Sequence, residues 1–257
     1  MSLITYAVEG RVGTITLNRP EKRNALNQEM VEALKQAFTQ AAGDPQAKVI
    51  VLRAEGEAFC AGADLAYLQQ LQKFSYEENL SDSRNLMQLY HLVYTVPKVV
   101  IACVEGHALA GGSGLVTVCD IAYSVPEAKF GYTEVRIGFI PALVSTFLIR
   151  KIGESKAREL LLSGRIITAD EAASLGMVTR VVSREAIRGE VKKLTDQLLT
   201  GASAQSLAAT KRLLDQVQGL PLVEALELAA KENASARGTE DCKRGIAAFL
   251  EKKELHW

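Results

Sequence analysis

The sequence predicts an α/β fold with one large core and a helical region at its carboxyl end. Short β-branched runs alternate with helical patterns early in the chain, and short connections between them favour strands and helices in one core. From residue 184 onward there is helical periodicity and little strand signal. A chain of 257 residues, 48% of them hydrophobic, can form one large core and a small appendage. We therefore divide the chain into a core, 1–183, and a helical region, 184–257.

The amino-terminal elements are a hairpin and a helix. Thr5–Val8 and Gly13–Leu17 are β-rich runs separated by Glu9-Gly10-Arg11, which predicts a turn. Asn18-Arg19-Pro20 ends the second strand. Asn27 then caps a helix that reaches about Ala42, whose apolar face consists of Met30, Leu34, Ala37, Phe38 and Ala41.

Two strongly apolar strands, Lys48–Arg53 and Val99–Val104, begin an internal repeat. We expect each of them to be buried on both faces. Residues 48–65 align without a gap with residues 98–115, and seven of the eighteen positions are identical. This indicates that a unit of strand, glycine turn, small-residue turn and helix is used twice, as in a spiral of stacked units.

The carboxyl-terminal region contains four helical patterns. They are separated by Gly201, by Gly219-Leu-Pro221 and by Gly238, and they cover roughly Ala186–Thr200, Ala204–Val217, Leu222–Ala236 and Asp241–Lys253. Leu222, Leu226 and Ala229 follow helical spacing, which predicts core packing or a subunit contact.

Composition excludes several classes of protein. The chain has 30 basic and 30 acidic side chains, which argues against nucleic acid as a partner. The first ten residues lack the pattern of a signal peptide, and the longest apolar run near the middle is too short to span a membrane. The cysteines and histidines show no metal-ligand spacing, so we expect reduced, mostly buried thiols and no metal: Cys60, Cys103, Cys119, Cys242, His91, His107 and His256. We expect a cytoplasmic enzyme.

Two turns of small residues are candidate binding elements. In Phe59-Cys-Ala-Gly-Ala-Asp-Leu65, Asp64 can cap a following helix, and Ala110-Gly-Gly-Ser-Gly-Leu115 precedes another apolar segment. Small residues let a backbone N–H approach a ligand, and the first N–H groups of a helix lack partners. Two such donors could form an oxyanion hole. The alternative is a pair of tight helix starts with no ligand.

Other interpretations of these glycines fail at particular residues. Gly112 stands where a phosphate-binding loop needs its lysine, which argues against hydrolysis of a nucleoside triphosphate. Ser113 is not in a nucleophile elbow, because Leu115 occupies the position of the last glycine. A dinucleotide fingerprint is also missing.

Several motifs, in order along almost the whole chain, resemble the crotonase superfamily of enoyl-CoA hydratases and isomerases. They are 59–65, 106–114, Cys119-Asp-Ile, 130–138, Pro141, and the pattern of Gly164, Ala169, Glu171, Gly176 and Val178. The resemblance implies a spiral core of ββα units, a trimer-forming carboxyl-terminal region, and an acyl-CoA thioester as substrate. It implies a homotrimer or a dimer of trimers, and no cofactor besides the coenzyme A of the substrate.

The resemblance also assigns site residues. The oxyanion donors fall on the backbone N–H groups of Ala63 and Gly111, which would stabilise a thioester enolate. Residues that would contact coenzyme A are Cys60, Ala61, Asp64, Leu65, Phe249 and Lys252. Lys252 can equally be a solvated helix charge.

The acid–base residues leave the reaction open. The hydratase pattern has two glutamates; Glu134 occupies the second position, but Gly114 occupies the first. Two carboxylates divide water activation and α-proton transfer between them, whereas one is enough to move a proton between the α and γ carbons. Physical reasoning therefore favours an isomerase, or a hydratase in which Glu134 handles both protons.

A finer resemblance favours the hydratase. Residues 134–145 resemble bacterial enzymes assigned as 3-methylglutaconyl-CoA or carboxygeranoyl-CoA hydratases. Arg136 could bind a substrate carboxylate, although a structural salt bridge is the simpler prediction. Tyr132 and His107 lie near the inferred site, and we interpret both as wall packing. A non-catalytic scaffold that binds coenzyme A or RNA remains a remote alternative.

Overall fold

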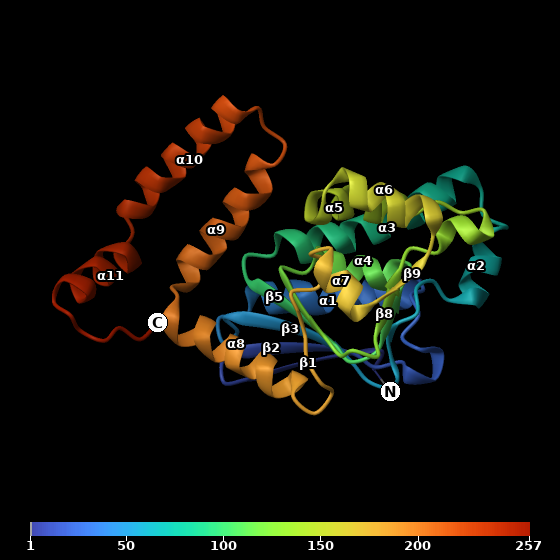
Figure 1. Ribbon diagram of the computed structural model, residues 1–257, viewed down its shortest axis with the longest axis horizontal. Coiled ribbons are helices and arrows are strands. Elements are labelled where there is room, and N and C mark those ends of the chain that lie inside the picture. The colour runs from blue at the N-terminus through green and yellow to red at the C-terminus, as the bar shows by residue number, and fades with distance from the viewer. Residues whose placement is uncertain (1) are drawn as a thin grey trace.

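A computed structural model describes residues 2–257, and the strands of this part of the chain form two sheets (Figure 1). The six-stranded sheet has the order β1 (Ile4–Glu9), β2 (Val12–Leu17), β3 (Val49–Ala54), β5 (Val99–Val104), β7 (Ile121–Ser124) and β10 (Arg180–Val181). The four-stranded sheet has the order β4 (Ala58–Cys60), β6 (His107–Leu109), β8 (Lys129–Gly131) and β9 (Ile166–Thr168).

The two sheets are linked by repeated units, so the predicted spiral is confirmed. Each unit places one strand in the large sheet and the next in the small sheet: β3 precedes β4, β5 precedes β6, and β7 precedes β8. In the large sheet β3 pairs in parallel with β5 from Val49 opposite Val99, which is the offset of the sequence repeat. In the small sheet β4 pairs in parallel with β6, with Cys60 opposite Ala108. The carboxyl ends of β4 and β6 therefore lie together.

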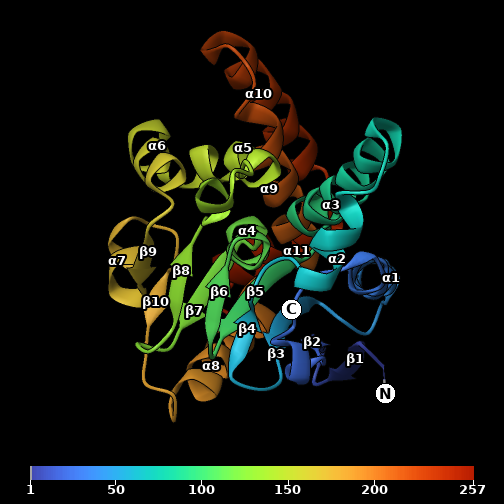
Figure 2. The same cartoon turned by 90° about the vertical axis from the view of Figure 1, so that its right-hand side faces the viewer.

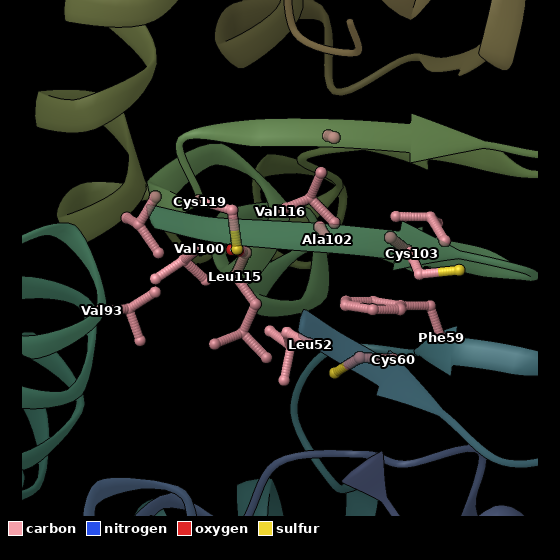
Figure 3. Packing of buried hydrophobic residues seen from close by; sticks show 14 of the residues in the cluster. Leu52, Phe59, Cys60, Val93, Val100, Ala102, Cys103, Leu115, Val116 and Cys119 are labelled. Carbon is pink, nitrogen blue, oxygen red and sulfur yellow. The ribbon is translucent and has the colours of Figure 1, made fainter. Parts of the chain in front are cut away.

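The core lies around these strands, and its contents agree with the predicted burial. Five of the six residues of β3 are buried. Phe59, Cys60, Leu115 and Val116 gather with apolar side chains of β3 and β5 (Figure 3). Cys60, Cys103 and Cys119 are buried free thiols, as predicted, while Cys242 is partly exposed.

Helices of the core cover the sheets and support the turns between strands (Figure 2). Asn27 caps α1 (Gln28–Gly43) by accepting a hydrogen bond from the Met30 N–H at 2.9 Å, and the predicted apolar face is buried. The remaining core helices are η1 (Pro20–Lys22), α2 (Leu65–Leu71), α3 (Tyr76–Thr95), α4 (Gly111–Val118), η2 (Glu134–Ile137), α5 (Ala142–Ile152), α6 (Glu154–Ser163) and α7 (Ala169–Ser174).

The carboxyl-terminal region forms α8 (Ile187–Gly201), α9 (Ala204–Val217), α10 (Leu222–Arg237) and α11 (Glu240–Leu250). The first of these packs against β3, β5 and β7, whereas α10 and α11 project from the core as an arm (Figure 1). The last helix ends three residues earlier than predicted, because Lys252 has a left-handed φ of 52°. Leu222 and Leu226 are 75% and 61% exposed, so this stripe is not core within one chain. Across residues 2–257, no helix has the length and apolarity to cross a membrane.

Candidate active site

The two predicted turns touch each other where β4 and β6 end. A Cβ atom on Gly62 would lie 2.9 Å from the Ala110 Cβ, and one on Gly112 would lie 2.1 Å from the Cys60 carbonyl oxygen. Gly62 also has a φ of 91°, which other residues rarely adopt. The glycines are therefore required for the close approach of the two turns.

Each turn presents one backbone amide without a partner. Within residues 2–257, neither the Ala63 N–H nor the Gly111 N–H donates a hydrogen bond to a backbone or side-chain acceptor. On either side of Ala63, the Gly62 carbonyl accepts from the Leu26 N–H at 2.7 Å and the Asp64 N–H donates to the Leu26 carbonyl at 2.8 Å. Gly111 is the first residue of α4, so its N–H is at the positive end of that helix. The two turns in contact therefore each hold an unpartnered amide, and a Cβ on Gly62 would lie 3.7 Å from the Gly111 nitrogen.

The Gly111 amide is aimed by a strained residue. Ala110 has φ 48° and ψ −122°, a conformation that non-glycine residues seldom adopt. Its N–H donates to the Gly131 carbonyl at 2.7 Å, and its carbonyl accepts from the Gly114 N–H at 3.1 Å. The ψ angle of Ala110 sets the plane of the peptide that carries the Gly111 N–H. This unusual conformation therefore determines the direction in which that N–H points.

Glu134 lies beside this turn, because β8 brings it there. β8 pairs with β6, and its last residue, Gly131, holds Ala110. Glu134 follows three residues later at the start of η2, and its Oε2 atom is buried without a hydrogen-bond partner in the described chain. Burial raises the pKa of this carboxyl, against a smaller lowering by its own backbone N–H. A carboxyl of this kind is suited to proton transfer.

The position of the missing first glutamate has no space for a side chain. A Cβ on Gly114 would lie 2.5 Å from Val144 Cγ1 and 2.7 Å from Tyr90 Oη. Glu134 is thus the single carboxyl that the two-glutamate pattern retains.

The loop residues assigned to coenzyme A have different surroundings. The Cys60 side chain is fully buried, and burial raises its pKa to about 12, so the thiol itself does not face a ligand. Asp64 is also buried: it caps α2 and pairs with Arg19 at 2.8 Å. Burial alone would raise the pKa of Asp64, but the Ala66 N–H and Arg19 lower it overall. Ala61 is half-buried and Leu65 is 78% exposed, so these two residues and the loop backbone remain accessible.

Phe249 and Lys252 do not join the site within one chain. Phe249 is 83% exposed near the end of α11, and Lys252 follows that helix. Figure 1 shows α11 and α2 at opposite ends of the molecule.

Of three further residues that were interpreted as structural from the sequence, one agrees with its prediction and two do not. Tyr132 is fully buried and its hydroxyl contacts the Thr117 hydroxyl at 2.5 Å, in agreement with wall packing. His107 is exposed instead, and its Nδ1 atom accepts a hydrogen bond from the Lys129 N–H at 3.2 Å. The salt bridge predicted for Arg136 is also missing: in the described residues this exposed side chain pairs with no acid.

A supporting segment was missed in the sequence. Arg19 to Leu26 runs along the Ala61–Asp64 loop and pairs with it through backbone hydrogen bonds, whereas only the strand end at residues 18–20 was recognised in the sequence. Asn24 is fully buried, and its Nδ2 donates to the carbonyls of Glu55 and Ala58 at 2.8 Å. The signal was weak, because one polar residue in a loop is usually solvated.

Comparison with known proteins identifies the family of the chain. Residues 7–257 match the family model described as enoyl-CoA hydratase/isomerase. A Thermus thermophilus protein assigned as an enoyl-CoA hydratase is 45% identical over 245 residues, 95% of this chain and 96% of the relative. A crotonyl-CoA hydratase of Syntrophomonas wolfei is 32% identical over 251 residues, 97% and 95% of the two chains. The structure of an enoyl-CoA hydratase from Shewanella pealeana has a TM-score of 0.94 at 29% identity, covering 100% of this chain and 96% of that one.

The family match, the relatives and the spiral of repeated units agree over nearly the full length. The chain belongs to the enoyl-CoA hydratase/isomerase family and is an enzyme with the crotonase fold.

Proposed function

We propose that the chain adds water across the 2,3 double bond of an enoyl-CoA thioester. The observation that carries this proposal is that two turns in contact each hold an unpartnered amide, at Ala63 and Gly111, and that the chain holding the second turn leads three residues later to Glu134, whose Oε2 atom is buried. The relatives assigned as hydratases support hydration rather than isomerisation as the reaction type.

The two amides act on the thioester oxygen. When hydroxide adds to C3, the electrons of the double bond move to C2 and into the carbonyl, and negative charge collects on the oxygen. Two fixed N–H donors stabilise this enolate more than the uncharged substrate, which lowers the barrier. Removing one such donor typically costs about 100- to 1000-fold in rate.

Glu134 performs both proton transfers. Its ionised carboxylate takes a proton from the attacking water as the oxygen bonds to C3, and the carboxylic acid then returns that proton to C2 of the enolate. The net change is addition of H and OH, and the carboxylate is regenerated. The raised pKa of Glu134 makes it a stronger base in the first step while keeping it able to hold the proton before the second.

The acyl group is proposed to be apolar, with a carboxylate at its far end. The segment after Glu134 exposes Ile137, Phe139 and Ile140 by 58–70%, which gives the site an apolar rim. Arg136 lies in the same segment with no acidic partner among the described residues, so its guanidinium can bind an anion. These features fit 3-methylglutaconyl-CoA or carboxygeranoyl-CoA, the substrates that the finer resemblance implies.

Replacing Arg136 tests this substrate class. We expect Arg136→Gln to raise KM for 3-methylglutaconyl-CoA by about tenfold or more, since a lost charged hydrogen bond costs about 1.5–3 kcal/mol, and to leave KM for crotonyl-CoA unchanged. Steady-state kinetics with both thioesters measure the ratio of the variant KM to the wild-type KM for each substrate. Arg158→Gln on exposed α6 is the matched control. An equal effect on both substrates would contradict carboxylate recognition.

The contacts to coenzyme A are proposed to come from two chains. Ala61 and Leu65 are accessible beside the oxyanion donors, while Phe249 and Lys252 lie on the arm at the far end of the same chain. In a homotrimer or a dimer of trimers, the arm of one subunit would bring these two residues to the site of another.

A second candidate is an isomerase, and a specific observation favours it: the site retains one carboxyl, and Gly114 has no room for the other. Incubation with crotonyl-CoA and with a 3-enoyl-CoA in heavy-oxygen water, followed by mass spectrometry, separates the two. Label in the product supports hydration. A moved double bond without label would contradict the hydratase and support the isomerase.

A further inference from the structure

Tyr90 lies directly behind the Gly111 turn, and the chemistry above assigns it no role. It comes from α3 and its side chain is fully buried. Its hydroxyl donates a hydrogen bond of 2.9 Å to the Gly111 carbonyl, and its ring packs edge-on against Phe147 with centroids 6.3 Å apart. A helix outside the two turns therefore contacts the residue that supplies an oxyanion donor.

The Gly111 turn needs such support because it contains strain. Ala110 holds φ 48° only if the surrounding contacts outweigh the cost of that conformation. Two backbone hydrogen bonds hold Ala110 itself. The Tyr90 hydroxyl is the side-chain bond that holds the following residue, and a Cβ on Gly111 would lie 3.1 Å from it.

The same hydroxyl occupies the space that a side chain at position 114, the position of the first glutamate in the two-glutamate pattern, would need. Its oxygen would lie 2.7 Å, and its ring carbon Cζ 3.0 Å, from a Cβ on Gly114, opposite Val144 Cγ1 at 2.5 Å. No side chain at position 114 can extend toward the substrate while Tyr90 and Val144 hold their places.

We propose that Tyr90 is a positioning residue of the oxyanion hole, which holds the Gly111 turn so that the Gly111 N–H is aimed at the thioester oxygen. Together with Val144 it fills the space of a second carboxyl, so that the proton transfers fall to Glu134 alone. This inference rests on the proposed thioester chemistry.

The Tyr90 hydroxyl is a donor over the whole working range. Burial raises the pKa of Tyr90 well above its ordinary value, and the nearby charge of Glu134 raises it further. The hydroxyl therefore keeps its proton while Glu134 changes its protonation state during the reaction.

Tyr90→Phe tests the proposal, because it removes one oxygen and keeps the ring against Phe147. We expect kcat for crotonyl-CoA to fall by about 10- to 100-fold, somewhat less than the loss of a whole oxyanion donor, with KM little changed. Infrared difference spectra of bound butyryl-CoA labelled with carbon-13 at the carbonyl add a direct measurement. A well-aimed hole polarises this carbonyl and lowers its stretching frequency, and we expect that shift to be smaller in the variant.

Tyr94→Phe is the matched control. Tyr94 lies one turn later on α3 and packs against the same Phe147, with centroids 5.1 Å apart, but in the described chain its hydroxyl makes no hydrogen bond to the Gly111 turn. Tyr94→Phe removes the same hydroxyl oxygen, and we expect it to leave kcat and the carbonyl stretching frequency unchanged.

A second variant separates the donor from packing. Incorporating 4-aminophenylalanine at position 90 restores an N–H donor at the place of the hydroxyl, and we expect it to recover most of kcat and of the carbonyl shift. This variant also provides the test if Tyr90→Phe folds poorly. A Phe variant with wild-type kcat and carbonyl shift, or an amino variant that folds but stays as slow as Phe, would overturn the proposal.

Failure of this inference is distinct from failure of the proposed function. If the wild-type chain binds butyryl-CoA without a carbonyl shift and hydrates no enoyl-CoA, the proposed function fails. If the wild-type chain shows both and Tyr90→Phe changes neither, only the role of Tyr90 is lost.

Discussion

Glu134 combines three properties that suit a proton carrier: partial burial, a raised pKa, and a buried oxygen that no other group in the described chain satisfies. An unsatisfied buried polar atom is unfavourable for folding, and in native proteins it usually has a reason. Under the proposed mechanism, this Oε2 atom takes a proton from the reacting water. The proposed catalytic role of the residue therefore opposes its contribution to stability.

The activity of Glu134 is tested by Glu134→Gln. The amide keeps the shape but cannot accept a proton at neutral pH, so we expect hydration to fall by about 1000-fold with the fold intact. In the wild type, kcat/KM should fall on the acid side at a pH above the ordinary carboxyl range, because the ionised form is the base. A progress-curve assay across pH measures both. A variant with near-wild-type turnover would remove Glu134 from the mechanism.

The same substitution has an expected effect on stability. The pKa of Glu134 is higher in the folded chain than in the unfolded chain, so the folded chain binds this proton more tightly. The free energy of unfolding therefore decreases as the pH rises from the pKa of Glu134 in the unfolded chain through its pKa in the folded chain. We expect Glu134→Gln to melt at a higher temperature than wild type at neutral pH, with the difference vanishing below about pH 4. Calorimetry at several pH values checks this; a difference independent of pH would contradict the raised pKa.

At the scale of elements, the sequence was most informative where one strand packs against its repeat. Val49 pairs with Val99 in the sheet, and the internal repeat of the sequence aligns the same two residues. The two offsets agree because stacked copies of one unit pair their equivalent strands in register. The capping residues Asn27 and Asp64 were also recognisable, since each side chain accepts a hydrogen bond from its own helix. These features are local or repeated, and a single sequence contains enough information to find them.

The features that could not be predicted are long-range. Nothing near Asn24 in the sequence indicates that it will bond to carbonyls more than thirty residues away. Tyr90 lies in a helix with ordinary periodicity, and only the fold places its hydroxyl on Gly111. The missing ion pair of Arg136 was mispredicted for the same reason, because charge pairing depends on which side chains the turns bring together.

The contact between the two turns gives an element-scale prediction. Gly112→Ala places a Cβ 2.1 Å from the Cys60 carbonyl oxygen, so the turn that follows β4 must move away from the Gly111 turn. We expect kcat/KM to fall by about 100-fold, comparable to losing one oxyanion donor, and the melting temperature to fall as well. Gly189→Ala in α8 is the control, since a Cβ there meets nothing within 4 Å. If Gly112→Ala keeps full activity, the turns do not need their close approach.

At the scale of the whole molecule, buried lysines join the helical region to the core. Lys48 donates to the carbonyls of Leu199 and Ala202 at 2.8 and 2.5 Å, at the end of α8. Lys211 of α9 bonds to Asp120 at 2.7 Å, and the same carboxylate accepts from the Val100 N–H at 2.7 Å. These bonds hold α8 and α9 against the large sheet, while the arm of α10 and α11 extends beyond them.

The apolar surface of the arm yields the last prediction. Leu222, Val223 and Leu226 of α10 are each more than 60% exposed, and burial against another subunit would remove this apolar area from water. If the proposed trimer forms through this surface, we expect Leu226→Lys to shift the protein to a smaller oligomer in light scattering. Ser235→Lys adds the same charge half a turn around the same helix and should leave the assembly intact.

The coupling between assembly and catalysis decides how Phe249 and Lys252 act. If these residues reach coenzyme A from a neighbouring arm, Leu226→Lys will raise KM for crotonyl-CoA as the oligomer dissociates, even though no residue of the oxyanion turns has changed. Raising the protein concentration should then restore KM together with the assembly, by mass action. Dissociation with unchanged KM would mean that each chain binds the thioester alone, and that the arm serves assembly only.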